Sequence, residues 1–351
     1  MPTGSHYFCM DEGMTKKRIA VAGAGKMARS RGRAFLETGR AQICAVASRR
    51  LDAAAACAAE LGCDVWFDDT RRLAEAHPDA ILIEVPHRAQ DDITRQVLED
   101  GFDVLIGGCL ASDPAAGAVI VELARAGDRV VEAGYQRRYD PAWVAIRDLV
   151  ATRELGEPVL AVTMALWRPD VDSWYCSQQD SGGMPLTHMS YCYLNAVRWI
   201  LGRPVTVAAM AHRRGEVNPD FVDEETCAAL IGFESGATLS ATASYRGPVG
   251  MQDPQTRFVF TAGGLQVGGA APADHDAITL LPDDGAAEVR TFPREPSAAV
   301  YQAHAFLDAL ESRRPARNPP EDALVDVHVA AAISQAAREG RTVELCPSAT
   351  Q

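Results

Sequence analysis

Short apolar runs alternate with helical patterns over the first third of the chain. The apolar runs at residues 18–22, 42–47, 81–85, 104–106 and 130–133 predict buried strands. Helical periodicity lies between them, at 27–37, 51–61 and 91–100. Because strands that alternate with helices are joined by right-handed crossovers, this pattern predicts a parallel sheet with helices packed on it.

The pattern changes after residue 140. A helix is predicted at 141–152, and strands at 159–167, 205–212, 226–233, 237–245 and 257–261 then dominate. Glu234-Ser235-Gly236 is typical of a hairpin turn, and residues 237–242 alternate as a half-exposed strand does. Helical patterns return at 189–201, 298–311 and 323–338. We therefore expect an α/β chain with a loose leader at 1–13, a dinucleotide-binding domain at 14–134 and an α+β domain at 135–351.

Composition narrows the functional classes. A chain of 351 residues favours two domains, and a net charge of −13 argues against a surface that coats nucleic acid. Nine scattered cysteines without a C-x-x-C pair indicate neither a disulfide framework nor a metal site. No signal peptide is evident, and no apolar stretch approaches the roughly 18 residues of a membrane span. We expect a cytoplasmic protein with no membrane or nucleic-acid partner.

A glycine-rich turn follows the first predicted strand directly. Its sequence is Gly23-Ala24-Gly25-Lys26-Met27-Ala28, a G-x-G-x-x-A turn that opens a helix. Gly23 permits the tight turn, Gly25 lets backbone amides approach a pyrophosphate, and the helix N-terminus favours the anion. In this strand–turn–helix context the motif predicts dinucleotide binding through these residues. The alternative is a glycine-rich turn that has lost its cofactor.

The second strand ends in a hydroxyl and two guanidinium groups, Ser48, Arg49 and Arg50. Sites specific for NAD usually place a carboxylate here to bind the ribose 2′-hydroxyl, and a carboxylate would repel a 2′-phosphate. Arginine forks bind phosphate. The sequence therefore favours NADP over NAD, although both arginines could also belong to a solvated helix start.

The chain resembles the glucose–fructose oxidoreductase, inositol dehydrogenase and MocA (Gfo/Idh/MocA) family from about residue 17 to residue 345. The resemblance rests on the glycine turn, on the spacing from Val85-Pro86 to Gly101, and on segments 134–139, 182–183, 198–202, 306–310 and 337–341. It implies a Rossmann domain followed by a domain built on a large, mostly antiparallel open sheet that often forms a homo-oligomer interface, as a dimer or tetramer. It also implies hydride transfer between a nicotinamide and a sugar or polyol, hence a small-molecule substrate.

The chain departs from the family where that family keeps its proton-transferring side chains. Family members typically carry Glu-Lys-Pro after the strand at 104–106, and the lysine takes part in proton transfer. Here the residues are Gly107-Gly108-Cys109, and lysine occurs only at positions 16, 17 and 26. A glycine cannot move a proton. Family members also often have asparagine and histidine where this chain has His87 and Gln90.

A second family signature, Asp-x-x-x-His-x-x-Asp, aligns with His188, Cys192 and Asn195. Spacings of four and seven residues on an α-helix predict that all three side chains share one stripe, which faces the cleft. Tyr191 and Tyr193 are expected to point elsewhere. At the three aligned positions, the family's carboxylate, imidazole and carboxylate thus correspond to an imidazole, a thiol and an amide in this chain.

These alignments give candidate roles. His188 is the acid–base candidate, with a hydrogen-bonded helix-start histidine as the alternative. Cys192 is a candidate nucleophile or an inert thiol, and Tyr135 is a further catalytic candidate or a packing residue. The substrate side is assigned to Cys109, Asn195 and Trp167, and the nicotinamide side of the cofactor to Pro86, His87, Gly107 and Gly108.

Two functions stay open from the sequence. One is an NADP(H)-dependent enzyme that transfers hydride to or from a C=N, C=C or C=O group, with its proton from His188, a tyrosine or water. The other is a redox-silent protein that acts as a lyase or cyclase, or as a regulatory ligand-binding protein.

Overall fold

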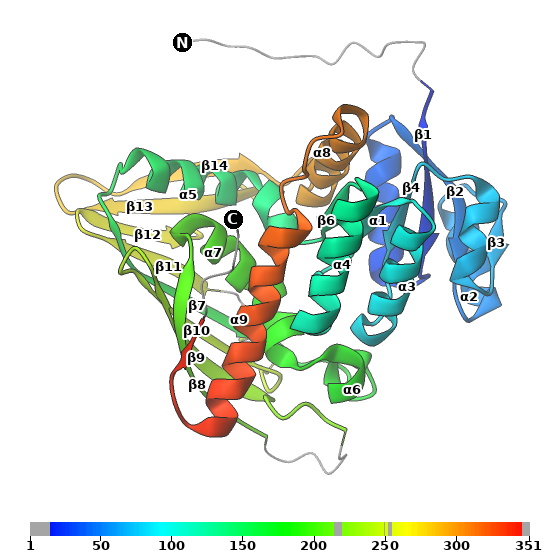
Figure 1. Cartoon of the computed structure of the whole chain (residues 1–351). Helices are drawn as coiled ribbons and strands as arrows, with labels where there is room; N and C mark the ends of the chain where they lie inside the picture. The colour runs from blue at the N-terminus through cyan, green and yellow to red at the C-terminus, as the bar shows by residue number, and fades with distance from the viewer. Residues whose placement is uncertain (1–14, 214–219, 249, 252–254, 346–351) are drawn as a thin grey trace, which may run out of the picture.

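The computed structural model describes residues 15–213, 220–248, 250–251 and 255–345. It contains two sheets that stand side by side, joined through helices (Figure 1). The expected leader, 1–13, lies outside the described residues.

The first sheet has six parallel strands in the order β3-β2-β1-β4-β5-β6, which is the predicted Rossmann arrangement. Its elements are β1 (Lys17–Ala22), α1 (Lys26–Glu37), β2 (Ala41–Ala47), α2 (Leu51–Glu60), β3 (Trp66–Phe67), β4 (Ala80–Ile83), α3 (His87–Glu99), β5 (Asp103–Ile106), α4 (Pro114–Gly127) and β6 (Val131–Ala133). Strand β3 was not predicted because two residues are too short to show a period. A 3₁₀ helix, η1 (Thr70–Ala76), follows it.

The second sheet has nine strands in the order β14-β13-β12-β11-β7-β10-β9-β8-β15. They are β7 (Pro158–Leu166), β8 (Pro204–His212), β9 (Thr226–Phe233), β10 (Thr238–Ser244), β11 (Gln255–Phe260), β12 (Gly263–Val267), β13 (His275–Pro282), β14 (Glu288–Pro293) and β15 (Val343–Glu344). Only β7 and β10 pair in parallel. The mostly antiparallel sheet is confirmed, including the β9–β10 hairpin.

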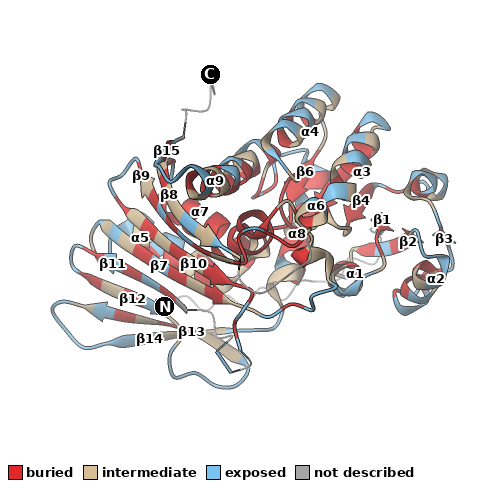
Figure 2. Cartoon of the chain, turned by 90° about the horizontal axis from the view of Figure 1, so that it is seen from below, coloured by how far each residue is buried: buried red, intermediate tan, exposed pale blue. Residues whose placement is uncertain are grey.

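Along the central strands of this sheet, buried positions alternate with more exposed ones (Figure 2). The buried side chains, such as Ala161, Ile231 and Leu239, join one core with Trp143 of α5 (Pro141–Thr152) and Val197 of α7 (Asn195–Leu201). The opposite side chains form the outer face of the sheet.

The last two helices tie the sheets together. Helix α8 (Ala298–Ser312) packs on α1, where Phe306 meets Phe35 at 6.1 Å between ring centroids. Helix α9 (Pro320–Glu339) lies between the sheets, against α4 and β8 (Figure 1). The boundary at residue 134 therefore stays a prediction, since the end of the chain returns to the first sheet.

Candidate functional site

A cavity of about 1130 Å³ opens at the carboxyl ends of the parallel strands. It extends from the tip of β2, past the glycine turn, to residues that follow β7. Ligands of doubly wound sheets bind at this edge. The volume suits a dinucleotide together with a small molecule.

The glycine turn forms the middle of the cavity wall. Gly23 has a φ of +123°, and a Cβ there would lie 2.1 Å from the carbonyl oxygen of Glu84. Gly25 precedes α1, and a Cβ on it would meet nothing within 4 Å. The first turn of α1 holds no acidic residue, so its amides and dipole are left for an anion. The turn fits a pyrophosphate.

The tip of β2 forms one end of the cavity. Ser48, Arg49 and Arg50 all line it, and both arginines are exposed. Neither guanidinium forms an ion pair with a side chain of the described residues. Arg71 also lines this end, but it forms hydrogen bonds with Asp69 at 2.7 and 2.9 Å.

The sequence did not predict that residues 68–72 line the cavity, because their position depends on the short strand β3, which was itself not predicted.

The loops after β4 and β5 form the other end. His87 is buried; its Nδ1 lies 3.0 Å from the carbonyl oxygen of Ser181, and its Nε2 lies 3.3 Å from Sγ of Cys109. Burial lowers the pKa of His87 to about 4, so the ring is neutral near pH 7. Burial also raises the pKa of Cys109 well above its usual range, which opposes a role as thiolate.

Gly107 and Gly108 differ in what they would tolerate. Gly108 has a φ of +111°, so a lysine at this position would be strained. Gly107 has no positive φ, but a Cβ on it would lie 2.1 to 2.3 Å from the carboxyl atoms of Glu84. The Glu84 carboxylate thus fills the volume beside Gly107.

A buried ion pair beneath the cavity was not predicted. Nε of Arg31 lies 2.6 Å from Oε1 of Glu84, and both side chains are less than a tenth exposed. Arg31 also donates to the carbonyl of Gly134 at 2.6 Å and to the hydroxyl of Tyr191 at 3.4 Å. Burial raises the pKa of Glu84, and Arg31 only partly opposes this shift. A glutamate at the end of an apolar strand was the available signal.

The helical stripe predicted for the second signature is wrong. Residues Pro185–Leu194 form a π-helix (η4), which is a rare element often found at functional sites. Thr187 and Tyr191 of this helix line the cavity, so the face that does so is displaced by one residue from the predicted stripe. The expectation that Tyr191 points elsewhere is therefore wrong. The hydroxyl groups of Thr187 and Tyr245 form a hydrogen bond of 3.1 Å.

His188 and Cys192 lie together, but not among the residues that line the cavity. Sγ of Cys192 is 3.6 Å from Nδ1 of His188, and the imidazole stacks on Trp167, which does line the cavity. Burial lowers the pKa of His188 to about 4 and raises that of Cys192. These environments oppose a general acid and a thiolate nucleophile near pH 7.

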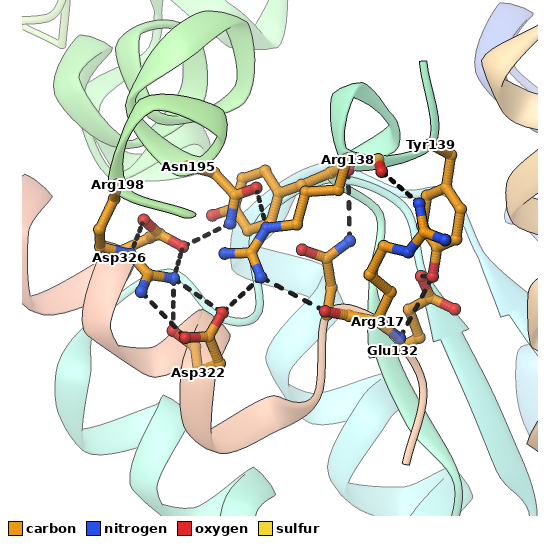
Figure 3. Close-up of polar contacts among 10 residues, drawn as sticks. Glu132, Arg138, Tyr139, Asn195, Arg198, Arg317, Asp322 and Asp326 are labelled. Atoms are coloured by element: carbon orange, nitrogen blue, oxygen red, sulfur yellow. Dashed lines mark hydrogen bonds and ion pairs between the residues drawn. The ribbon is translucent and has the colours of Figure 1, made fainter. Parts of the chain in front are cut away.

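Asn195 does not reach the cavity, which corrects the expectation that it contacts substrate. It belongs to the buried network of Figure 3, accepting from Arg138 at 2.8 Å and donating to Asp326 at 2.6 Å. Arg198 binds the same aspartate at 2.7 Å. After the π-helix, the chain has turned this amide toward α9.

Tyr135 is a second correction. Its side chain is 1% exposed and belongs to the apolar core of the first sheet, and it is not among the cavity-lining residues. Burial raises its pKa well above the usual range. Packing, the alternative considered from the sequence, describes its position.

The described residues hold no cluster of three or more histidine, cysteine, aspartate or glutamate side chains that could bind a metal ion. Among the helices in the described ranges, none is both long and apolar enough to cross a membrane.

Two models of one family match the chain. Residues 17–135 match the oxidoreductase family model with an NAD-binding Rossmann fold, and residues 143–266 match the GFO/IDH/MocA C-terminal domain. The chain belongs to the Gfo/Idh/MocA family of oxidoreductases. Membership agrees with the glycine turn and with both sheets.

Proteins similar to this chain include a glucoside dehydrogenase and an inositol dehydrogenase. D-glucoside 3-dehydrogenase of Escherichia coli is 24% identical over 346 residues, which is 93% of this chain and 97% of the relative. Inositol 2-dehydrogenase 4 of Saccharopolyspora erythraea is 25% identical over 231 residues, 61% of this chain and 64% of its own length. The solved structure of levoglucosan dehydrogenase in complex with NADH has a TM-score of 0.84 at 16% identity, covering 94% and 99% of the two chains, and shows the shared fold.

Proposed function

We propose that this chain is an NADP(H)-dependent oxidoreductase that transfers hydride to or from a small unsaturated or hydroxylated molecule with a non-standard set of proton-handling residues. The observation that carries the proposal is the continuous cavity, which joins Arg49 and Arg50 to the glycine turn and then to Gly108 and Trp167. A bound nicotinamide would supply or take up two electrons as hydride.

The preference for NADP is supported by charge. Arg49 and Arg50 stand where a carboxylate would select NAD, and Ser48 adds a hydroxyl. Because a 2′-phosphate is a dianion with several acceptors, two guanidiniums at the tip of β2 favour it over a ribose hydroxyl.

The substrate end is aromatic. Trp167, Trp174, Tyr175 and Tyr191 line it, with Trp174 stacked on Tyr175 at 4.1 Å between ring centroids. Besides its tyrosines and Cys109, this end holds a neutral histidine, His87, and the paired Arg31 and Glu84. A compact substrate with a planar C=N, C=C or C=O group suits such a wall better than a polyol, which needs many hydrogen-bond partners.

The redox-silent alternative is favoured by one observation. Gly108 has a φ of +111°, which would strain a lysine side chain. The resemblance implies a lysine at this position, and without it the loop has no proton carrier of that kind. In that case the dinucleotide would bind without turnover.

Calorimetry with NADPH and NADH tests the proposal first, followed by absorbance assays of both dinucleotides. Candidate oxidation substrates are myo-inositol, a methyl glucoside and levoglucosan, and candidate reduction substrates are small imines, enones and ketones. We expect tighter binding of NADPH and its oxidation by one of the unsaturated compounds. Absence of binding by both dinucleotides would end the proposal, whereas binding without turnover across the panel would support the redox-silent alternative.

A homo-oligomer through the second sheet is part of the proposal. Ala208, Leu230, Ser240 and Val162 form one cross-strand row on its outer face, and Met210 nearby is 81% exposed. An apolar face of this kind favours association. Light scattering should report an oligomer that Leu230→Arg dissociates, while Val171→Arg, on an exposed loop, leaves it intact; a monomeric wild type would contradict this.

A further inference from the structure

The hydroxyl of Tyr191 is held at the cavity by a buried cation. Nη2 of Arg31 donates to this oxygen at 3.4 Å, so the oxygen acts as acceptor and its own proton remains available for another partner. When the proton leaves, negative charge develops on the oxygen. A guanidinium fixed beside it stabilises that charge.

Arg31 is a rigid neighbour rather than a mobile surface arginine. Its guanidinium contacts Glu84, the carbonyl of Gly134 and Oε1 of Gln302, each at 2.6 Å. The residue is 3% exposed. A guanidinium with its directions fixed by three partners can place the fourth, Tyr191, with little loss of side-chain freedom.

Glu84, which holds the guanidinium of Arg31, occupies space beside Gly107. A Cβ on Gly107 would fall 2.1 to 2.3 Å from its three carboxyl atoms, and the backbone at 107 does not require glycine. The Glu-Lys-Pro of the resemblance places a glutamate at 107. In this chain the carboxylate enters the same volume from the end of β4, while β5 ends in glycine.

We infer that Tyr191 exchanges the proton with the substrate, and that Arg31 and Glu84 are positioning residues. Glu84 reaches from the end of β4 into the volume that a side chain at position 107, after β5, would otherwise fill. The inference rests on the proposed function. In reduction, the nicotinamide supplies the hydride for the new C–H bond and becomes oxidised. The Tyr191 O–H bond breaks, its proton goes to the other atom of the double bond, and water returns a proton to the phenolate.

Other proton carriers at this end are less suited. His188 lies against Trp167 rather than on the cavity wall, and burial lowers the pKa of His87 and His188 to about 4. Both rings are therefore neutral near pH 7. Cys109 is buried beside His87.

An ultraviolet titration of the ligand-free protein tests the arrangement without turnover. Glu84→Gln keeps the shape of the side chain and removes the charge that neutralises Arg31. One tyrosine should then form its phenolate at lower pH than in the wild type. The same substitution in a Tyr191→Phe background should produce no such shift, whereas in a Tyr193→Phe background it should, because Tyr193 of the same helix packs on Trp143. A shift that survives Tyr191→Phe, or no shift at all, overturns the inference.

Turnover of the compound found in the screen gives the second test. Tyr191→Phe should lower kcat about 100-fold or more, the usual range for loss of a general acid. NADPH affinity measured by calorimetry should change little, because phenylalanine keeps the ring and lacks only the hydroxyl. Tyr193→Phe should retain activity. If Tyr191→Phe binds NADPH normally and keeps the wild-type kcat and pH profile, this inference alone is refuted. If the wild-type protein binds neither dinucleotide, the proposed function itself is refuted.

A carboxylate swap tests the role of Glu84. Glu84→Ala should lower kcat and, like Glu84→Gln, let the tyrosine form its phenolate at lower pH than in the wild type. Adding Gly107→Asp returns a carboxylate to the same volume, and it should move both quantities back toward the wild-type values. The Cγ of an aspartate lies about 1.5 Å beyond a Cβ that already falls within the present carboxyl volume. If the double variant behaves like Glu84→Ala although calorimetry shows that it binds NADPH, the exchange of positions is refuted.

Discussion

His188 stacks on Trp167 with ring centroids 5.5 Å apart and an interplanar angle of 24°. The imidazole thus lies against a ring that itself forms the cavity wall, and burial lowers the pKa of His188 to about 4. Sequence alignment alone made this histidine the acid–base candidate. Its surroundings instead suit a neutral packing partner of an aromatic wall.

His188→Gln should therefore lower activity less than about tenfold, well below the usual loss for a general acid, and leave the pH profile unchanged between about pH 6 and 8. The reason is that the wild-type ring carries no charge in that range. Steady-state kinetics against pH provide the measurement, with Tyr191→Phe for comparison. An acidic limb in this range that disappears in the variant would restore His188 as the acid–base group.

Arg49→Asp should reverse the cofactor preference. A carboxylate at the tip of β2 repels a 2′-phosphate and can accept from a ribose hydroxyl. NADPH affinity should fall about 10- to 100-fold, the size expected when a charged hydrogen bond is lost, and NADH affinity should hold or rise. Calorimetry with both dinucleotides measures this. Arg95→Asp, on the exposed face of α3, serves as the control; equal affinities in wild type and Arg49→Asp would remove the case for NADP.

The two glycines of the turn should respond differently to alanine. Gly23→Ala combines a φ of +123° with a 2.1 Å approach to a carbonyl oxygen, and should cost about 2–4 kcal/mol of unfolding free energy. Gly25→Ala meets nothing within 4 Å, so stability should change little while NADPH affinity falls, because the methyl group faces the cofactor's path. Denaturant unfolding and calorimetry separate the two effects, and equal stability losses would contradict this account of the turn.

The parallel sheet was predictable because apolar strand periods, helical periods and the glycine turn all indicated one fold. Strands β12 and β14, two of the strands that were not predicted, were missed for an equally physical reason. β12 begins with Gly263-Gly264, and β14 is largely exposed, so neither shows a clear apolar alternation.

The site was only partly predictable. Residues of the glycine turn and the tip of β2 line the cavity as expected, because they follow strands whose ends meet at one edge. The face of the π-helix that lines the cavity could not be foreseen from spacing, since Thr187 and Tyr191 have the same spacing of four residues as His188 and Cys192 but lie one residue earlier. The Arg31–Glu84 pair escaped notice because its two residues are separated by 53 positions and carry no local motif.

Asp326→Ala should be strongly destabilising. Asp326 is fully buried and binds Arg198 at 2.7 Å and Asn195 at 2.6 Å, so its loss leaves a buried guanidinium without one of its two carboxylates (Figure 3). Breaking such a pair costs about 3–5 kcal/mol. Denaturant unfolding should show this, whereas Glu234→Ala, which breaks an exposed pair with Arg203, should change stability little. Similar costs for both would mean that the network of Figure 3 adds no stability.

Glu132 should make stability depend on pH in a defined direction. Burial raises its pKa from 4.5 to about 7, against the hydrogen bonds from Gln302 and Tyr139 to Oε1. At a pH between about 4.5 and 7, the folded protein keeps a proton on Glu132 that the unfolded chain releases. The stability gained from the neutral carboxyl is therefore complete below about pH 4.5 and lost as the pH rises through about 7.

Glu132→Gln keeps an oxygen acceptor for both donors and cannot ionise. Its stability relative to the wild type should rise with pH and reach on the order of a few kcal/mol above pH 7. The difference between the two proteins is the quantity to measure, because His87 and His188, with lowered pKa values, act on absolute stability in the opposite direction over nearly the same range. Those two contributions cancel in the difference. A difference in unfolding free energy that stays flat from pH 4 to 8 would show that Glu132 titrates alike in the folded and unfolded chains.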